Sequence, residues 1–546
     1  MQKVLIIFYL ASVLHLSICD LCKICKCSTS DGLIEYDCDG KFNPNSDDMD
    51  LLSSIYESPP SKLILSNNWI NKTSIERIAY LIDLEFLVLS HNNITEVDPI
   101  ILESFTKLKE LDLSWNNIEN FDIGALAKGR FIQLVDLSHN NMKSINSSLE
   151  SPLEVLDSLY LSNNLLKQLP INFFNNFPKL STLDLSNNFF TSFEYYLSNV
   201  EGLKLLNLEH NSLNSSIMGA NLQELRIGYN DLTSLPKNLS VESLSIENNK
   251  ISDIEYDEML FNELKYLNLS GNHLSVILNL TLPKLKEMDI SNNAFVSIPE
   301  NFMSDNLPSL ETLVVNGNPI KELKFLNQLN LRNLVVKNIT LLNAIYDDAF
   351  DKLKGHDGNC INITISSNKN LKEFDEKAIR GMNICYLDLS DNGFTRVSQK
   401  LEKILNGTLP EYGINLQGNP FICDCKSEWM LEELVPKLYA LNPELLIDLK
   451  CASPPKLVGK RMVHWMQWKG QVFCDDTLTG SDFSRLEVFE GSRQFFNKKN
   501  EIALKSGGGM LLIVIGAVVT LLLLVLSGMI ISYKSALRRR RVNRRL

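Results

Sequence analysis

The 546-residue sequence lacks the short motifs that mark several large classes of enzyme. It contains no HExxH zinc-protease motif, no GxSxG nucleophile turn and no GxxxxGK(S/T) phosphate-binding loop. Histidine is scarce, although three of the seven residues, His91, His139 and His210, fall at the same place in a repeated pattern. His91 and His139 are two repeats apart, about 10 Å, whereas each ligand of one zinc ion lies about 2 Å from it. We therefore expect no enzyme, no metal site and no cofactor.

Positive charge is scarce outside one short segment. The whole chain has a net charge of −12, but its final thirteen residues, KSALRRRRVNRRL, hold seven Lys or Arg and no acid. Without those seven charges and that of Lys3, residues 20–533 carry a net charge of −20. So acidic a region repels nucleic acid and anionic lipid, and we expect neither as its partner.

Two long hydrophobic runs lie near the ends of the sequence. Residues 1–19, MQKVLIIFYLASVLHLSIC, have the form of a secretory signal peptide that is cut before Asp20. Residues 510–533 carry no charge, and a helix of that length rises about 36 Å, enough to cross a hydrocarbon core of about 30 Å. The basic segment that follows, residues 534–546, marks the cytoplasmic side. The sequence thus predicts a plasma-membrane protein of the single-pass type I class, with its amino terminus outside.

One eleven-residue pattern recurs through most of the chain, as in LKELDLSWNNI from Leu108 to Ile118. Leucines stand at positions one, four and six, asparagine at nine and an aliphatic residue at eleven. A degraded copy, LRNLVVKNITL, begins at Leu331, and the total is about sixteen repeats. The position-nine residues are Asn68, Asn92, Asn116, Asn140, Asn164, Asn188, Asn211, Asn230, Asn249, Asn272, Asn293, Asn318, Asn368, Asn392 and Asn419.

The pattern has a physical reason. Alternating residues such as Leu111 and Leu113 place one face of a short strand in the interior. Asparagine carries both donors and an acceptor, so at position nine it can bond the backbone of neighbouring loops. One repeat cannot bury its apolar face alone, and the repeats therefore stack into a curved solenoid with a parallel sheet on its concave side.

The chain resembles extracellular leucine-rich repeat proteins over about residues 22–475. The resemblance implies an α/β leucine-rich repeat solenoid in residues 61–420, between an amino-terminal cysteine cap (20–60) and a carboxyl-terminal cysteine cap (421–475). A stalk (476–509) precedes the membrane helix. Toll-type receptors have similar ectodomains but carry a large cytoplasmic signalling domain. Because the tail here is short, we do not expect autonomous signalling.

Ten cysteines follow residue 19, an even number that suits full pairing in an oxidising compartment. Sequence alone allows many connectivities. The family resemblance implies four cap disulfides: Cys22 with Cys27, Cys25 with Cys38, Cys423 with Cys451 and Cys425 with Cys474. Cys360 and Cys385 lie in consecutive repeats. Adjacent rungs are about 4.8 Å apart, which permits a bridge, and two free, half-buried thiols are the alternative.

Ten glycosylation sequons precede the membrane segment, as a lumenal face requires: Asn71, Asn93, Asn146, Asn214, Asn238, Asn268, Asn279, Asn338, Asn362 and Asn406. Two of them, Asn268 and Asn362, stand between strand positions that should be buried, so glycans there would obstruct the concave face in the later repeats. Protein contacts are then expected either in the lateral loops or on the early concave stretch, around Asp112, Ser114, Asp136 and Asp184. The opposing interpretation is that LDLS is simply a common way to write an exposed strand of this repeat.

These features predict a cell-surface glycoprotein that binds another protein, in adhesion, which includes homophilic adhesion, or as a ligand-binding co-receptor. Its mechanism would be presentation, because a preorganised surface lowers the ordering cost of association. Two alternatives are innate immune recognition, in which a captured microbial product passes to a signalling partner, and a matrix component released by cleavage of the stalk.

Overall fold

The computed structural model describes residues 20–30, 33–42, 59–71, 75–146, 152–170, 173–193, 202–215, 217, 219, 221–255, 257–278, 280–401, 409–465 and 472–474. The predicted signal peptide, stalk, membrane segment and basic tail lie outside these residues. Among the described helices, none is long and apolar enough to cross a membrane. The chain divides into two compact units, residues 1–385 and 386–546, and each is described by itself.

One long sheet organises the first unit, and its strands pair in parallel from each turn to the next after an initial antiparallel pair. The antiparallel pair is β1 (Lys26–Ser30) and β2 (Leu33–Asp37). The parallel strands that follow β2 are β3 (Lys62–Ile64), β4 (Phe86–Val88), β5 (Glu110–Asp112), β7 (Leu134–Asp136), β9 (Ser158–Tyr160), β10 (Thr182–Asp184), β11 (Leu205–Asn207), β12 (Asn221–Arg226), β13 (Ser240–Ser245), β14 (Tyr266–Asn268), β15 (Glu287–Asp289), β16 (Thr312–Val314), β18 (Asn333–Lys337) and β21 (Ile361–Ser366).

This arrangement confirms a leucine-rich repeat solenoid, of about fourteen turns. The sequence predicted about sixteen repeats for the whole chain. Two further parallel strands, β23 (Ile384–Asp388) and β24 (Ile414–Asn415), pair with one another. The boundary between the two units falls within β23, and β24 belongs to the second unit. The degraded copy at Leu331 forms β18, between β16 and β21, even though it lacks the position-nine asparagine.

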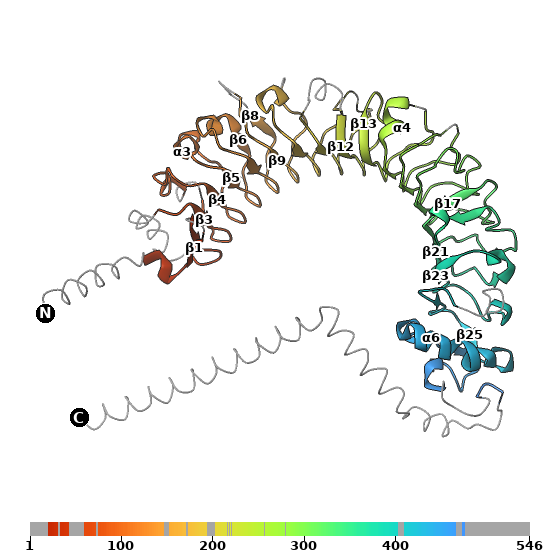
Figure 1. Cartoon of the computed structure of the whole chain (residues 1–546). Coiled ribbons are helices and arrows are strands. Elements are labelled where there is room, and N and C mark those ends of the chain that lie inside the picture. The colour runs from red at the N-terminus through yellow and green to blue at the C-terminus, as the bar shows by residue number, and fades with distance from the viewer. Residues whose placement is uncertain are drawn as a thin grey trace, which may run out of the picture. The chain divides into compact units, whose positions relative to one another are not determined.

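The sheet of the first unit lies on the inner side of a bend, and short helices and small ladders lie on its outer side (Figure 1). The amino-terminal cap adds η1 (Asp20–Lys23). The outer elements are α3 (Pro99–Ser104), β6 (Asn120–Asp122), η3 (Ile123–Lys128), β8 (Ser144–Asn146), η4 (Phe173–Asn176), α4 (Glu258–Glu263), β17 (Leu329–Leu331), β19 (Ala344–Ile345), β20 (Leu353–Gly355), η5 (His356–Gly358), β22 (Glu373–Phe374) and η6 (Glu376–Ile379).

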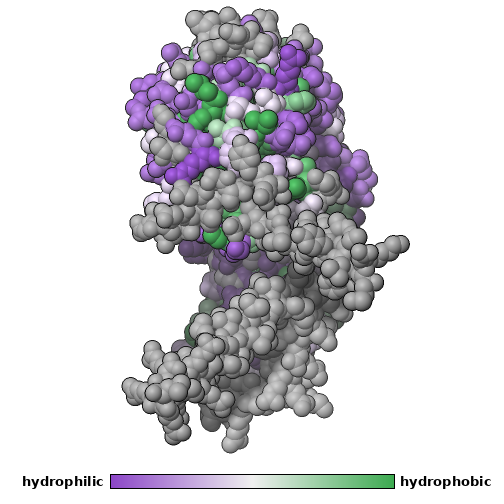
Figure 2. Space-filling view, turned by 90° about the vertical axis from the view of Figure 1, so that its left-hand side faces the viewer, coloured by the Kyte–Doolittle hydropathy of each residue, from purple (hydrophilic) through white to green (hydrophobic). Residues whose placement is uncertain are grey.

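The core of each turn is built from the predicted apolar positions. Leu108, Leu111, Leu113 and Ile118 are all buried, with 0–1% of their surfaces exposed. Burial of one such side chain stabilises the fold by about 1.5–3 kcal/mol. On the face drawn in Figure 2, the described residues are largely hydrophilic, with a few apolar side chains among them. The leucine positions therefore hold the turns together and leave the exposed strand positions free to vary.

The second unit contains the carboxyl-terminal cap. Its elements are β25 (Phe421–Ile422), η7 (Cys425–Ser427), the π-helix η8 (Met430–Leu434), α6 (Val435–Leu441), η9 (Pro443–Leu446), β26 (Cys451–Ser453) and η10 (Met462–Trp465). The carboxylate of buried Glu428 accepts the amide hydrogens of Val472 (2.9 Å) and Phe473 (2.6 Å). Burial raises the pKa of Glu428, although the two amides oppose the shift. This carboxylate ties the end of the cap to its helical part.

Five disulfides are present among the described residues. Four have the pairing that the family resemblance implies: Cys22 with Cys27, Cys25 with Cys38, Cys423 with Cys451, and Cys425 with Cys474. Cys360 and Cys385, for which the sequence left a bridge and two free thiols open, are also bonded to one another. Disulfides of this number are typical of proteins that fold in an oxidising compartment.

Candidate binding surface

The exposed face of the sheet carries side chains in rows that run from turn to turn. The parallel register places Asp112 beside Asp136, Tyr160 and Asp184 in one row, which continues through Asn207 and Arg226. The backbone amide one position later in each turn bonds the next turn, as where Leu113 N donates to Asp136 O (2.8 Å). Each row is thereby held at fixed spacing, which preorganises the surface for a partner.

The early part of this row contains two neighbouring carboxylates. Asp112 Oδ1 accepts hydrogen bonds from the amide (2.9 Å) and hydroxyl (2.7 Å) of Ser114, and Asp136 Oδ1 accepts one from the amide of Ser138 (2.8 Å). Burial raises the pKa of Asp136; the bonds from Ser138 oppose the shift, and the charge of Asp112 adds to it. Both carboxylates are half-buried and fixed in direction.

The four predicted contact residues differ in their strand neighbours and in their exposure. Asp112 and Asp136 are direct neighbours, whereas Asp184 lies two strands beyond Asp136 with Tyr160 between them. Ser114 differs from the expectation, because its side chain is only 7% exposed and its hydroxyl donates a hydrogen bond to Asp112. Serine at this position therefore fixes the neighbouring carboxylate and offers little contact surface itself.

An aromatic stack that sequence reasoning missed lies next to the acidic pair. The ring of Trp115 stacks on His139 at a centroid distance of 3.7 Å and on His91 at 5.0 Å, with interplanar angles of 10° and 11°. Trp115 is 49% exposed. Burial lowers the pKa of His139, and the Asp136 carboxylate opposes that shift. The sequence already showed that His91 and His139 share one repeat position. Trp115 occupies the same position in the repeat between them, and this was the feature that could have predicted the stack.

These aromatic residues occupy a position with a left-handed backbone. The φ angles of His91, Trp115 and His139 are all 54°. This conformation lets Trp115 N donate to Ser138 O (2.9 Å) on the next turn, and His139 N makes the equivalent bond to Ser162 O (2.9 Å). Asparagine occupies the position in many other turns and glycine in some, as at Gly271. Both tolerate this backbone better than an aromatic residue does.

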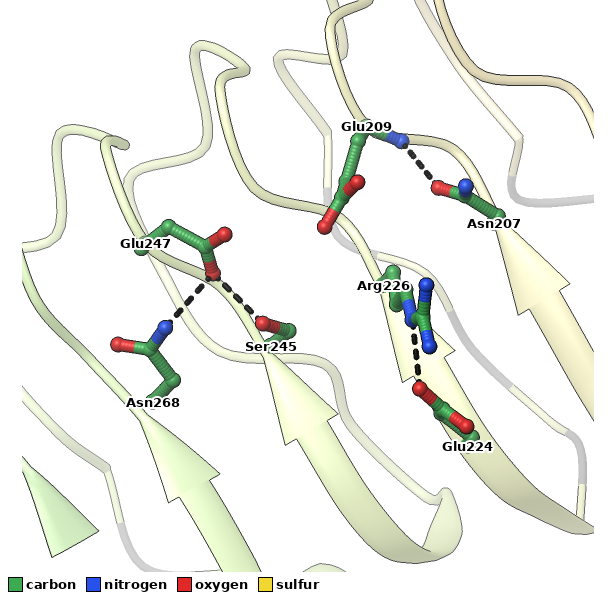
Figure 3. Close-up of polar contacts among 7 residues, drawn as sticks. All are labelled: Asn207, Glu209, Glu224, Arg226, Ser245, Glu247 and Asn268. Atoms are coloured by element: carbon green, nitrogen blue, oxygen red, sulfur yellow. Dashed lines mark hydrogen bonds and ion pairs between the residues drawn. The ribbon is translucent and has the colours of Figure 1, made fainter. Parts of the chain in front are cut away.

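A second polar cluster covers strands β11 to β14 (Figure 3). Arg226 Nε donates to Glu224 Oε1 (2.5 Å) on the same strand. Glu247 Oε2 accepts from Ser245 Oγ (2.7 Å) and from Asn268 Nδ2 (3.2 Å). A Cβ atom at Gly228, where most turns carry serine, would lie 2.7 Å from the Glu247 carboxyl carbon. The missing side chain at Gly228 therefore makes room for Glu247.

Glu209 completes this cluster. Its amide donates to Asn207 Oδ1 (3.0 Å), and its side chain lies at the loop that follows β11 (Figure 3). Burial raises the pKa of Glu209, and the negative charge of Glu247 adds to the rise, while the positive charge of Arg226 opposes it. The sequence shows the acidic and basic residues here but not this mutual arrangement, which depends on the pairing of neighbouring turns.

Two sequons, at Asn268 and Asn362, lie on strands of the sheet. Asn268 ends β14 in the row of Asp112, and Asn362 on β21 donates to Asn333 Oδ1 (2.9 Å). Both side chains are half-buried. Five further sequon asparagines are exposed: Asn71, Asn93, Asn214, Asn238 and Asn338. Asn279 and Asn406 lie outside the described residues, as does the side-chain environment of Asn146.

No group of three or more His, Cys, Asp or Glu side chains is placed to hold a metal ion in the part of the chain that the structure describes. The stacked histidines are separated by the Trp115 ring rather than directed at a common point. The arrangement of this surface suits contact with another macromolecule, through fixed charges beside exposed aromatic rings.

Comparison with known proteins agrees with the fold. Three segments match family models: residues 154–213 match "Leucine rich repeat", 82–125 match "Leucine Rich repeats (2 copies)" and 263–285 match "Leucine Rich Repeat". A solved structure titled "Crystal structure of TLR13-ssRNA13 complex" is similar with a TM-score of 0.56 at 19% identity, over 77% of this chain and 62% of that one. The fold is that of a leucine-rich repeat solenoid, and the three family matches lie within it.

Curated relatives include extracellular and receptor-like proteins. The chain is 27% identical to mouse CD180 antigen over 278 residues, which are 49% of this chain and 38% of that protein. It is 30% identical to human oligodendrocyte-myelin glycoprotein over 165 residues, 28% of this chain and 36% of that protein. Bovine Toll-like receptor 10 is 31% identical over 101 residues, 18% of this chain and 12% of that protein. In each case the matched region spans well under half of the relative.

Proposed function

We propose that this chain is a cell-surface protein that binds another protein through the exposed face of its early turns, in adhesion or as a ligand-binding co-receptor. One observation carries the proposal: the parallel register aligns half-buried carboxylates and exposed aromatic rings in fixed rows on one side of the sheet. Rigid side chains lose little further entropy on binding, so such rows favour association with a shaped partner.

The proposed location follows from several features together. Residues 510–533 would span the plasma membrane, with the sequons and disulfides on the extracellular side. Cell-surface or extracellular relatives, such as oligodendrocyte-myelin glycoprotein and CD180 antigen, support this location. The acidic charge of residues 20–533 favours a protein partner with basic side chains over nucleic acid.

A second candidate is innate immune recognition. The partial likeness to CD180 antigen and to Toll-like receptor 10 favours it. In this case the same rows would capture a microbial product and present it to a signalling partner. The two candidates differ in their ligand, since adhesion needs a second cell and recognition needs a microbial molecule.

A cell-mixing assay tests the first candidate. Labelled cells that express the full-length chain are shaken with unlabelled parental cells and with a panel of other cell types, after surface biotinylation has shown that the chain is exposed. Clusters of expressing cells alone would indicate homophilic adhesion, and mixed clusters would indicate a different protein partner. A chain that is not biotinylated at the cell surface would contradict the proposed location, and a surface-exposed chain that forms no clusters with any cell type would contradict adhesion.

A further inference from the structure

Within the exposed stack of His91, Trp115 and His139, the tryptophan is the residue that does not suit its backbone. At a φ of 54° it costs about 1–2 kcal/mol relative to an ordinary backbone, whereas histidine is among the residues that adopt this region more readily. Asparagine tolerates the same conformation more easily and holds it at Asn163 and Asn187, the next two turns. The fold itself therefore does not require aromatic residues at this position.

Stacking offsets part of this cost but leaves the ring edges in solvent. Ring pairs stabilise one another by about 0.5–1.5 kcal/mol, and Trp115 stacks on a ring at each side. Even so, Trp115 remains 49% exposed. Exposed aromatic side chains are enriched at protein contacts, and tryptophan is enriched among the residues that dominate binding energy.

The negative charge of Asp112 and Asp136 beside the stack favours a partner with a basic side chain. Asp112 and Asp136 occupy adjacent strands, and the two carboxylates and His139 lie close enough to influence one another electrostatically. No lysine or arginine is paired with either carboxylate among the described residues. A basic side chain from outside would relieve the repulsion between the two acids.

We propose that His91, Trp115 and His139, together with Asp112 and Asp136, form a docking surface for a protein segment that presents an arginine or lysine side chain beside an apolar one. The carboxylates would bind the basic group, and the exposed edge of the stack at Trp115 would contact the apolar neighbour. This inference rests on the proposed function, and it adds the chemistry of the partner and the turns that recognise it.

The decisive variant is Trp115→Asn in the full chain, purified in mild detergent. Asparagine suits the left-handed backbone and creates no sequon here, because Asn117 stands two residues later. The relieved backbone cost and the lost ring stacking are of similar size, so the variant should unfold at about the same temperature as wild type, and lost binding is then not lost folding. Tyr229→Asn is the matched control, because Tyr229 has a φ of 55° and stacks on His210 but lies far from the acidic pair.

The probe is a fluorescein-labelled peptide of alternating arginine and leucine, compared with the same peptide carrying glutamine for arginine. We expect Trp115→Asn to weaken binding of the arginine peptide by about tenfold or more. Tyr229→Asn should leave it unchanged. Asp136→Ala should weaken it as well; alanine is used since asparagine there would form a sequon with Ser138. The glutamine peptide should bind much more weakly to the wild-type chain.

Equal affinities of wild type and Trp115→Asn would overturn the inference, as would equal binding of the arginine and glutamine peptides or the absence of saturable binding. These outcomes are independent of the cell-mixing result. Cells that cluster normally with the Trp115→Asn chain would leave binding of a protein partner standing and place its contact outside the docking surface.

Discussion

Asn116 on one turn accepts the amide hydrogen of Ile94 on the preceding turn through its Oδ1 atom, at 3.0 Å. Its Nδ2 atom donates to the carbonyl oxygens of Leu89 and Leu113, both at 3.0 Å. The same pattern recurs at Asn140 and Asn164. One side chain thus satisfies buried backbone groups of two turns, which explains why asparagine recurs at position nine.

Asn116→Ala should destabilise the protein by about 3 kcal/mol, because an unpaired buried backbone group costs about 1–3 kcal/mol and this change leaves more than one. The measurement is the free energy of unfolding in urea. Asn117→Ala is the control: Asn117 is exposed and bonds Asn93 Oδ1 (2.7 Å), so its loss should change stability by under about 0.5 kcal/mol. Similar losses for both variants would contradict the ladder.

Glu209 should make stability depend on pH in a defined direction. Its pKa in the folded protein is raised by burial and then by Glu247. Its contribution to stability is therefore greatest below the pKa of the unfolded chain, about 4.3, and falls as pH rises through the folded pKa. Glu209→Gln removes this titration, so the stability of the variant relative to wild type should be higher at pH 7 than at pH 4. Thermal unfolding at both values tests this, and a difference of opposite sign would refute the cause.

The sequon at Asn268 should affect the later turns rather than the early docking surface. Asn268 Nδ2 donates to Glu247 Oε2 (3.2 Å), in the loop that follows β13. A glycan there would cover the middle cluster. Glycopeptide mass spectrometry should find Asn268 occupied, and Asn268→Gln should leave binding of the arginine peptide unchanged. A gain of binding after that substitution would show that the contact surface extends into the later turns.

Glu428 should be important for the stability of the carboxyl-terminal cap. Glu428→Ala leaves the amides of Val472 and Phe473 without their acceptor in a buried place, a loss of about 2–4 kcal/mol. Limited proteolysis should cut the variant near residues 472–474 faster than wild type. Glu432→Ala provides the control, since Glu432 is exposed. Unchanged proteolysis of the Glu428→Ala chain would argue against this anchoring role.

The fold was predictable because the same pattern of leucine and asparagine positions recurs along the sequence. Leu111 and Leu113 are buried at positions that one copy of the pattern suggests and that the other copies reinforce. The cap pairings, such as Cys22 with Cys27, followed from the family resemblance rather than from spacing. The pairing of Cys360 with Cys385 needed the structure, because their repeat positions allowed both a bond and free thiols.

The candidate site was less predictable, because it depends on contacts between turns. The sequence placed Asp112 and Asp136 on the exposed face but could not show that Ser114 is buried beneath Asp112. It also placed histidines at one repeat position without showing that Trp115 lies stacked between them. Periodicity assigns a residue to a face, whereas ring stacking depends on the backbone conformation and the spacing of neighbouring turns.

Site-specific photo-crosslinking tests most directly whether the early turns contact a protein partner. A photoreactive phenylalanine analogue is introduced in place of Trp115, and in a second chain in place of Phe131, which is 54% exposed and outside the aligned rows. Both chains are expressed at full length on cells that cluster in the mixing assay, and then irradiated. We expect a discrete crosslinked protein from the Trp115 position and none from the Phe131 position. Equal crosslinking from both positions, or crosslinking from Phe131 alone, would contradict this contact.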